Sequence, residues 1–156
     1  MNEFIHIPPM AGSRIIAGCG GRDSIIKQLS MLDGFTGYAY LKTDTLAISS
    51  GYFLSLEPAK IVPFIQNLSQ QGIVGITLKG RYFDYQLPEY VLHAANHLNF
   101  PIILLAPEIK FYELFDFFYS HIHCYRTGSY LLREQVTSFL VRAIYRDGLD
   151  GFAKQL

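Results

Sequence analysis

Hydrophobic residues along the middle of this chain follow two alternating patterns. Short, nearly continuous apolar runs are typical of buried strands, and longer segments with apolar residues three or four apart are typical of helices. Three such strands are predicted, at 45–49, 73–78 and 101–106. Each is followed by a predicted helix, at 58–71, 88–98 and 110–122. This order predicts an α/β fold in which crossover helices connect the strands of a mostly parallel sheet.

Two further apolar runs, at 14–18 and 25–32, precede this series and predict additional strands at an edge of the sheet. The glycine-rich segment GCGGRD, residues 18–23, lies between them. It lacks the third glycine of a dinucleotide loop and the Lys-Ser/Thr pair of a phosphate loop. We therefore interpret it as a turn that needs a positive φ angle.

Polar residues stand where the three central strands are predicted to end. In open parallel sheets, ligands bind outside the carboxyl ends of the strands. Hydroxyls, cations, a carboxylate and aromatic rings gathered there would suit a small ligand with a carboxylate or planar amide group. The alternative, polar residues that merely end strands as in any fold, stays open. The candidate ligand-binding residues are Ser49, Ser50, Gly51, Lys79, Gly80, Arg81, Tyr82 and Glu108.

Composition narrows the classes of function. The 13 basic and 13 acidic residues cancel, so the chain lacks the positive field that attracts nucleic acids or anionic lipids. DNA binding by this chain alone is not expected. Cys19 and Cys124 lie far apart without metal or redox spacing, which is typical of reduced thiols in the cytoplasm. No apolar stretch approaches the ~20 residues that cross a bilayer, so no membrane contact is expected.

Metal-binding patterns are weak. His93 and His97 have the i, i+4 spacing of zinc helices, but no third ligand is evident, and both lie opposite the apolar helix face. A solvated face is the simpler interpretation. His121, His123 and Cys124 cluster near a predicted helix end without further support for a site. We assign no metal and no cofactor.

Catalytic signals are equally sparse. The chain has neither a nucleophile elbow nor paired carboxylates at a fixed spacing. A hydrolase that uses Ser49 or Ser50 would need a base close to the serine, and the sequence indicates none. No catalytic residue is assigned, and the protein is not expected to be an enzyme.

A longer helix is predicted at 130–146, and its apolar residues form a narrow stripe suited to a partner helix. The candidate dimerisation residues are Leu132, Val136, Phe139, Leu140 and Ala143. The final residues, DGLDGFAKQL, contain nothing that closes a fold, so we expect that the chain was cut from a longer one.

Five segments, in order, resemble the amino-terminal domain of the purine catabolism regulator (PucR) family of bacterial transcription regulators. They are AGSRIIAGCGGRD, DTLAISSG, QQGIVGITLKGRYFDYQLP, AANHLNFPIILLAP and IKFYELFDFF. The resemblance covers residues 4–122. It departs at the hydroxyl pair, where the family usually has threonines, and at Thr45, where the family more often has an acid.

The resemblance implies a regulatory domain at 4–122, with a fold similar to the amino-terminal domains of HPr kinases and Mur ligases. Residues 123–156 would then be a connector helix and the start of a truncated middle region. It also implies a cytoplasmic homodimer that contacts DNA only through a carboxyl-terminal helix-turn-helix domain absent from this chain. The leading hypothesis is a domain that senses a small-molecule effector. The alternative is a structural dimerisation module without a ligand of its own.

Overall fold

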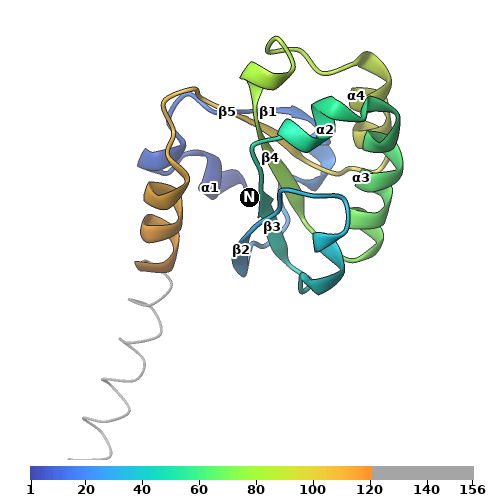
Figure 1. Cartoon of the computed structure of the whole chain (residues 1–156). Helices are drawn as coiled ribbons and strands as arrows, with labels where there is room; N and C mark the ends of the chain where they lie inside the picture. Colours follow the sequence, from blue (N-terminus) through green and yellow to red (C-terminus); the bar gives the residue numbers. More distant parts are fainter. Residues whose placement is uncertain (121–156) are drawn as a thin grey trace, which may run out of the picture. The chain divides into compact units, whose positions relative to one another are not determined.

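A five-stranded sheet with the order β1-β5-β4-β3-β2 forms the centre of the computed structural model, which describes residues 1–120 (Figure 1). The strands are β1 (Arg14–Ala17), β2 (Gln28–Met31), β3 (Thr45–Ile48), β4 (Gly75–Lys79) and β5 (Ile102–Leu105). Strands β2 to β5 are parallel to one another, and β1 pairs with β5 in the antiparallel direction. The predicted α/β class with a mostly parallel sheet is confirmed. The two early strands lie at opposite edges of the sheet.

Short helices and turns connect the strands. The α-helices are α1 (Asn2–Ile5), α2 (Tyr52–Leu56), α3 (Ile61–Gln70) and α4 (Glu89–His97), and residues 111–120 are also helical. The 3-10 turns are η1 (Pro8–Met10), η2 (Cys19–Gly21), η3 (Gly37–Tyr40), η4 (Pro58–Lys60) and η5 (Gly80–Tyr82). Residues 1–115 form one compact unit, and a second begins at residue 116.

One predicted helix begins later than expected. We predicted an α-helix from Pro58, but Pro58 opens the 3-10 turn η4 and α3 begins at Ile61. In an α-helix continuous from Pro58, Pro63 would have to donate a hydrogen bond to the carbonyl of Ala59. Proline has no N–H, and its ring would clash with that carbonyl. Within the first turn of α3, by contrast, a missing N–H costs nothing.

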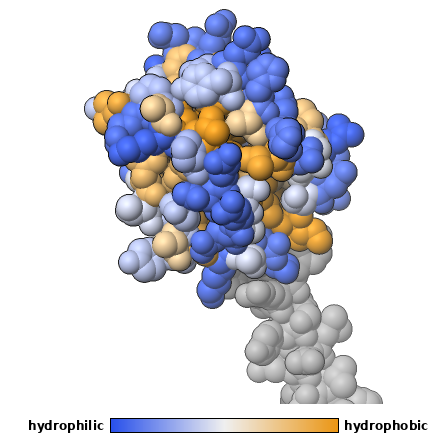
Figure 2. Space-filling model, turned by 90° about the vertical axis from the view of Figure 1, so that its right-hand side faces the viewer, coloured by the Kyte–Doolittle hydropathy of each residue, from blue (hydrophilic) through white to orange (hydrophobic). Residues whose placement is uncertain are grey.

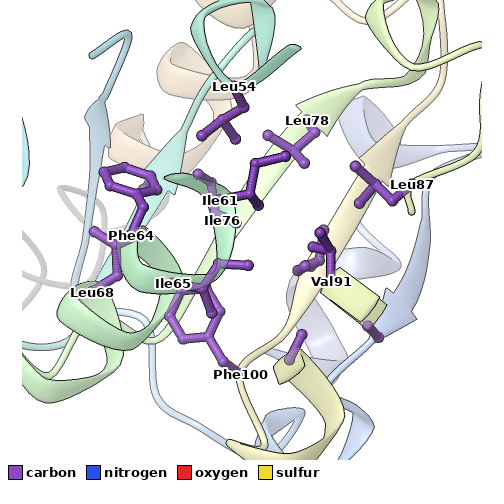
Figure 3. Packing of buried hydrophobic residues seen from close by; sticks show 14 of the residues in the cluster. Leu54, Ile61, Phe64, Ile65, Leu68, Ile76, Leu78, Leu87, Val91 and Phe100 are labelled. Atoms are coloured by element: carbon purple, nitrogen blue, oxygen red, sulfur yellow. The ribbon is translucent and has the colours of Figure 1, made fainter. Parts of the chain in front are cut away.

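The main hydrophobic core lies between the sheet and helices α2, α3 and α4 (Figure 3). Buried α3 side chains follow the predicted face, at Ile61, Phe64, Ile65 and Leu68. They contact a cluster that includes Ile76 and Leu78 of β4, Val91 of α4 and Phe100. The outer surface of these helices mixes polar and apolar side chains (Figure 2).

The opposite face of the sheet is buried as well. Register places Leu46, Ile48 and Ile103 on this face, and all three are fully buried. Helix α1 lies on this side, away from α3 and α4 (Figure 1). Burial on both faces explains why the central strands read as continuous apolar runs and not as alternating patterns.

The glycine-rich segment packs tightly against the turn before β5. Gly18 has a φ of +70°, which confirms the predicted positive φ, and its N–H donates to Asn96 Oδ1 at 2.7 Å. A Cβ atom on Gly18 would stand 2.0 Å from the Phe100 carbonyl oxygen, and one on Gly21 would stand 2.1 Å from that of Asn99. These glycines therefore allow two backbone segments to meet at the end of the sheet where β5 begins.

Candidate functional site

The carboxyl ends of the parallel strands share one edge of the sheet, and polar residues collect there. Because β1 runs in the opposite direction, the residues just before it join the same edge, where Ser13 Oγ accepts from Ala106 N at 3.3 Å. We call this edge the carboxyl rim and define it by residues 12–13, 33, 49–51, 79–82 and 106–108. The predicted strand-end loops are therefore brought to one edge.

A carboxylate that the sequence analysis missed organises one end of the carboxyl rim. Asp33 follows β2, and its Oδ1 accepts from Ser50 N and Ser50 Oγ at 3.2 Å each and from Ser49 Oγ at 3.4 Å. The signal that could have revealed it was present, since Asp33 is the first polar residue after the apolar run at 25–32.

The hydroxyl pair builds the turn into α2. Ser49 Oγ accepts from Gly51 N at 2.9 Å, and Ser50 Oγ accepts from Tyr52 N at 3.3 Å. Gly51 has a φ of +79°, which a side chain would strain. Both hydroxyls thus already donate to Asp33 and accept from the backbone. Their primary role in this geometry is to shape the loop, and their candidate role in ligand binding stays a prediction.

Lys79 connects the sheet to the chain that follows β5. Its Nζ donates to the Ile109 carbonyl at 2.8 Å and lies 5.1 Å from the centre of the Phe111 ring. Partial burial, and secondly the positive charge of Arg81, lower the pKa of the Lys79 ammonium below its usual value. The charged form of Lys79 is therefore destabilised at this position, and a bound anion would stabilise it.

Arg81 forms an exposed platform with two tyrosines. Its guanidinium Cζ lies 4.8 Å from the centre of the Tyr82 ring, and its Nη2 donates to Tyr82 Oη at 2.8 Å. The Tyr82 ring is 5.3 Å from the ring of Tyr52, which is 53% exposed. We call Tyr52, Arg81 and Tyr82 the aromatic platform. Such a group offers a flat apolar surface beside a planar cation.

The two remaining candidate residues, Gly80 and Glu108, lie at different positions on the carboxyl rim. Gly80 is buried, and its carbonyl accepts from the N–H groups of Phe83 and Tyr85, so it forms the turn that presents Arg81. Glu108 is exposed, and its Oε1 lies 3.9 Å from where a Cβ on Gly12 would stand. Glu108 is therefore on the β1 side of the carboxyl rim, with the cations between it and Asp33 in strand order.

The charged side chains of the carboxyl rim form no salt bridges with one another. Within residues 1–120, the salt bridges are Lys27–Asp44, Lys60–Glu57 and Lys110–Glu113, and none involves a residue of the carboxyl rim. Arg81 is exposed and has no ion-pair partner within the described part of the chain, so a carboxylate could bind to it.

Other predicted features lie elsewhere or outside the described residues. His93 and His97 are exposed on α4, as expected for a solvated face. The described residues contain no group of three His, Cys, Asp or Glu side chains placed to hold a metal ion. His121, His123, Cys124 and the five candidate dimerisation residues lie outside residues 1–120. None of the described helices is long and apolar enough to cross a membrane.

Thr45, where this sequence departs from the commoner acid of the family that it resembles, lies at the other end of β3 from this site. It begins β3, is fully buried, accepts from Gln28 Nε2 and donates to the Lys42 carbonyl, both at 2.6 Å. The departure therefore concerns the packing of the start of the sheet and not the carboxyl rim.

Comparisons with known proteins agree with the resemblance. The model of the purine catabolism regulatory protein-like family matches residues 3–122. The chain is also similar to the purine catabolism regulatory protein of Bacillus subtilis (strain 168), with 23% identity over 120 residues. This alignment covers 77% of the chain and 23% of that relative, so the chain spans about a quarter of the relative's length. No solved structure matches. The chain thus belongs to the purine catabolism regulatory protein-like family.

Proposed function

We propose that this domain senses a small planar anion at the carboxyl rim on behalf of a bacterial transcription regulator. The observation that carries the proposal is the aromatic platform, in which Arg81 lies beside two partly exposed tyrosine rings, two residues from Lys79 along the chain. Among residues 1–120, Arg81 has no ion-pair partner. Asp33 and Glu108 flank these cations and would select against ligands with too much negative charge.

The chemistry of the site narrows the ligand. A guanidinium binds a carboxylate or a similar planar anion through two parallel hydrogen bonds. Tyrosine rings favour a flat ring system that can stack on them. The name of the Bacillus relative refers to purine catabolism, and an oxidised purine such as urate is both planar and anionic. Purine-degradation products are therefore the first class of ligand to test.

Calorimetry with three probes separates the contribution of the ligand's charge from that of its flat ring. Urate is a planar anion, xanthine is a planar ring with little charge at neutral pH, and malonate is an anion without a ring. We expect urate to bind most tightly, because it uses both the cations and the rings. Binding of none of the three by the folded chain would contradict sensing at this site.

Variants then locate the binding. Arg81→Gln should weaken urate binding by about tenfold or more, because a hydrogen bond between charged groups is lost. Lys60→Gln is the matched control, since Lys60 is also exposed beside an aromatic ring, that of Phe35, but lies outside the carboxyl rim. An equal effect of the two substitutions would indicate a non-specific attraction for anions.

The pH dependence follows from Lys79. Because its pKa is lowered in the free protein, the ammonium loses its proton at a lower pH than an ordinary lysine. Anion affinity should therefore fall as the pH rises through that lowered pKa. Binding should also take up protons in that range, since the bound anion raises the pKa of Lys79. Affinity that is constant up to the ordinary lysine range would exclude Lys79 from the contact.

A second candidate function is assembly, and the predicted stripe from Leu132 to Ala143 favours it. In this case the domain would serve to pair two copies of its regulator, and DNA would be contacted by a part of the regulator outside this chain. Sedimentation of the whole chain and of a version that ends at Thr127 tests this. A dimer that becomes a monomer on truncation would place assembly in the segment after Thr127.

A further inference from the structure

We propose that Lys79 fastens residues 109–111, where the helix at 111–120 begins, to the carboxyl rim, and that an anion bound there draws the ammonium away and loosens this segment. The release step rests on the proposed function, whereas the fastening does not. The pair of interactions that Lys79 Nζ makes with the Ile109 carbonyl and the Phe111 ring is called the Lys79 contact.

The donor is held by the rigid part of the fold. Lys79 is the last residue of β4, which lies between β3 and β5 in the sheet. Its backbone is opposite Leu105 in the register, and its N–H donates to the Ser50 carbonyl at 3.2 Å. The ammonium is therefore positioned from a fixed point, and the Lys79 contact restrains the segment and not the sheet.

The acceptor belongs to the chain on its way out of the sheet. Ile109 is buried and lies just before the helix at 111–120, in which Leu114 is fully buried. A carbonyl oxygen and a ring that both face one ammonium fix the direction in which this segment leaves the carboxyl rim. Any change in the Lys79 contact is thus felt first at residues 109–115.

An anion on the carboxyl rim would compete directly for the ammonium. The Ile109 carbonyl is a neutral acceptor, whereas an anion carries a full opposite charge and attracts the ammonium more strongly. Partial burial and the neighbouring Arg81 already disfavour the charge of Lys79, and an anion between the two cations would remove that second cost. A ligand that prefers the released arrangement shifts the population toward it, which is the requirement for signalling.

Hydrogen exchange of the full chain tests the fastening without any ligand. Lys79→Met keeps the apolar stem and removes the ammonium, and we expect exchange of the amides at 110–115 to rise by about tenfold. Lys79→Arg should retain most of the protection, because a guanidinium can still donate. Lys27→Met is the matched control, since Lys27 is an exposed lysine paired with Asp44 at 2.7 Å and lies outside the carboxyl rim.

The outcomes separate the two steps. Unchanged exchange at 110–115 in Lys79→Met overturns the fastening, whether or not any ligand binds. Malonate at saturation should raise exchange of the same amides in the unmodified chain and leave it unchanged in Lys79→Met. Binding of malonate without this rise overturns the release. If calorimetry detects no anion on the carboxyl rim, the proposed function and the release both fail, and the fastening is still judged by Lys79→Met alone.

Discussion

The two ends of the sheet look alike in sequence and differ in what they do. Each carries a segment of small polar residues after an apolar run, GCGGRD at one end and SSG at the other. At the glycine-rich end, Gly18 and Gly21 are pressed against the backbone of the turn before β5. At the carboxyl rim, the small residues form a turn into α2 that leaves Tyr52 exposed, and Arg81 is exposed in the neighbouring turn after β4.

Small residues therefore serve two distinct purposes in this fold. At the glycine-rich end they remove side chains so that two backbone segments can approach each other. At the carboxyl rim the serine hydroxyls accept from the N–H groups of Gly51 and Tyr52, and so they form the turn that carries the exposed ring of Tyr52. Substitutions at the two ends should separate stability from binding.

The largest effect is expected at the glycine-rich end. Gly18→Ala would place a Cβ atom 2.0 Å from the Phe100 carbonyl oxygen at a φ of +70°, so the free energy of unfolding should fall by about 3 kcal/mol or more. Gly34→Ala is the control, because nothing lies within 4 Å of its Cβ position. Chemical denaturation measures both variants. A Gly18→Ala protein as stable as the control would contradict the close approach.

A smaller loss of stability is expected from the turn at the carboxyl rim. Ser49→Ala removes a buried oxygen that accepts from Gly51 N, and an unsatisfied buried donor costs about 1–3 kcal/mol. Ser50→Ala is the partner variant and should cost less, because Ser50 is not fully buried. Denaturation of both variants tests this order. The reverse order would mean that Ser50, and not Ser49, holds the turn.

The smallest effect on stability is expected at Arg81. This variant distinguishes most clearly between a role in stability and a role in ligand binding. Arg81 is exposed, so Arg81→Gln should change the free energy of unfolding by less than about 0.5 kcal/mol. Thermal denaturation without ligand checks this value. A large loss would indicate that the aromatic platform is a structural element, and the weaker binding expected of this variant could then not be ascribed to a lost ligand contact.

Much of the sheet could be predicted from the sequence because its central strands are buried on both faces. A short, continuous apolar run such as that at 101–106 is best explained as a buried strand. The antiparallel direction of β1 could not be predicted, since strand direction depends on how the chain returns and not on the residues of the strand. Helix α2 was missed because five residues between Gly51 and Glu57 are too few to show a periodicity.

The carboxyl rim was predicted in outline but not in its connections. Lys79, Arg81 and the serines were found because they follow central strands. Asp33 was missed because it follows an edge strand whose apolar pattern is weaker. The Lys79 contact depends on the path of residues 106–111, which no local pattern in the sequence specifies.

The reversed direction of β1 has a consequence for how this family can diversify. Gly12 and Ser13 reach the carboxyl rim from the start of an edge strand, ahead of every crossover connection. Insertions, deletions or substitutions in this lead-in would reshape one side of the site while the parallel strands keep their pairing. One side of the carboxyl rim is thereby supplied by residues 12–13, which lie outside the parallel strands β2 to β5.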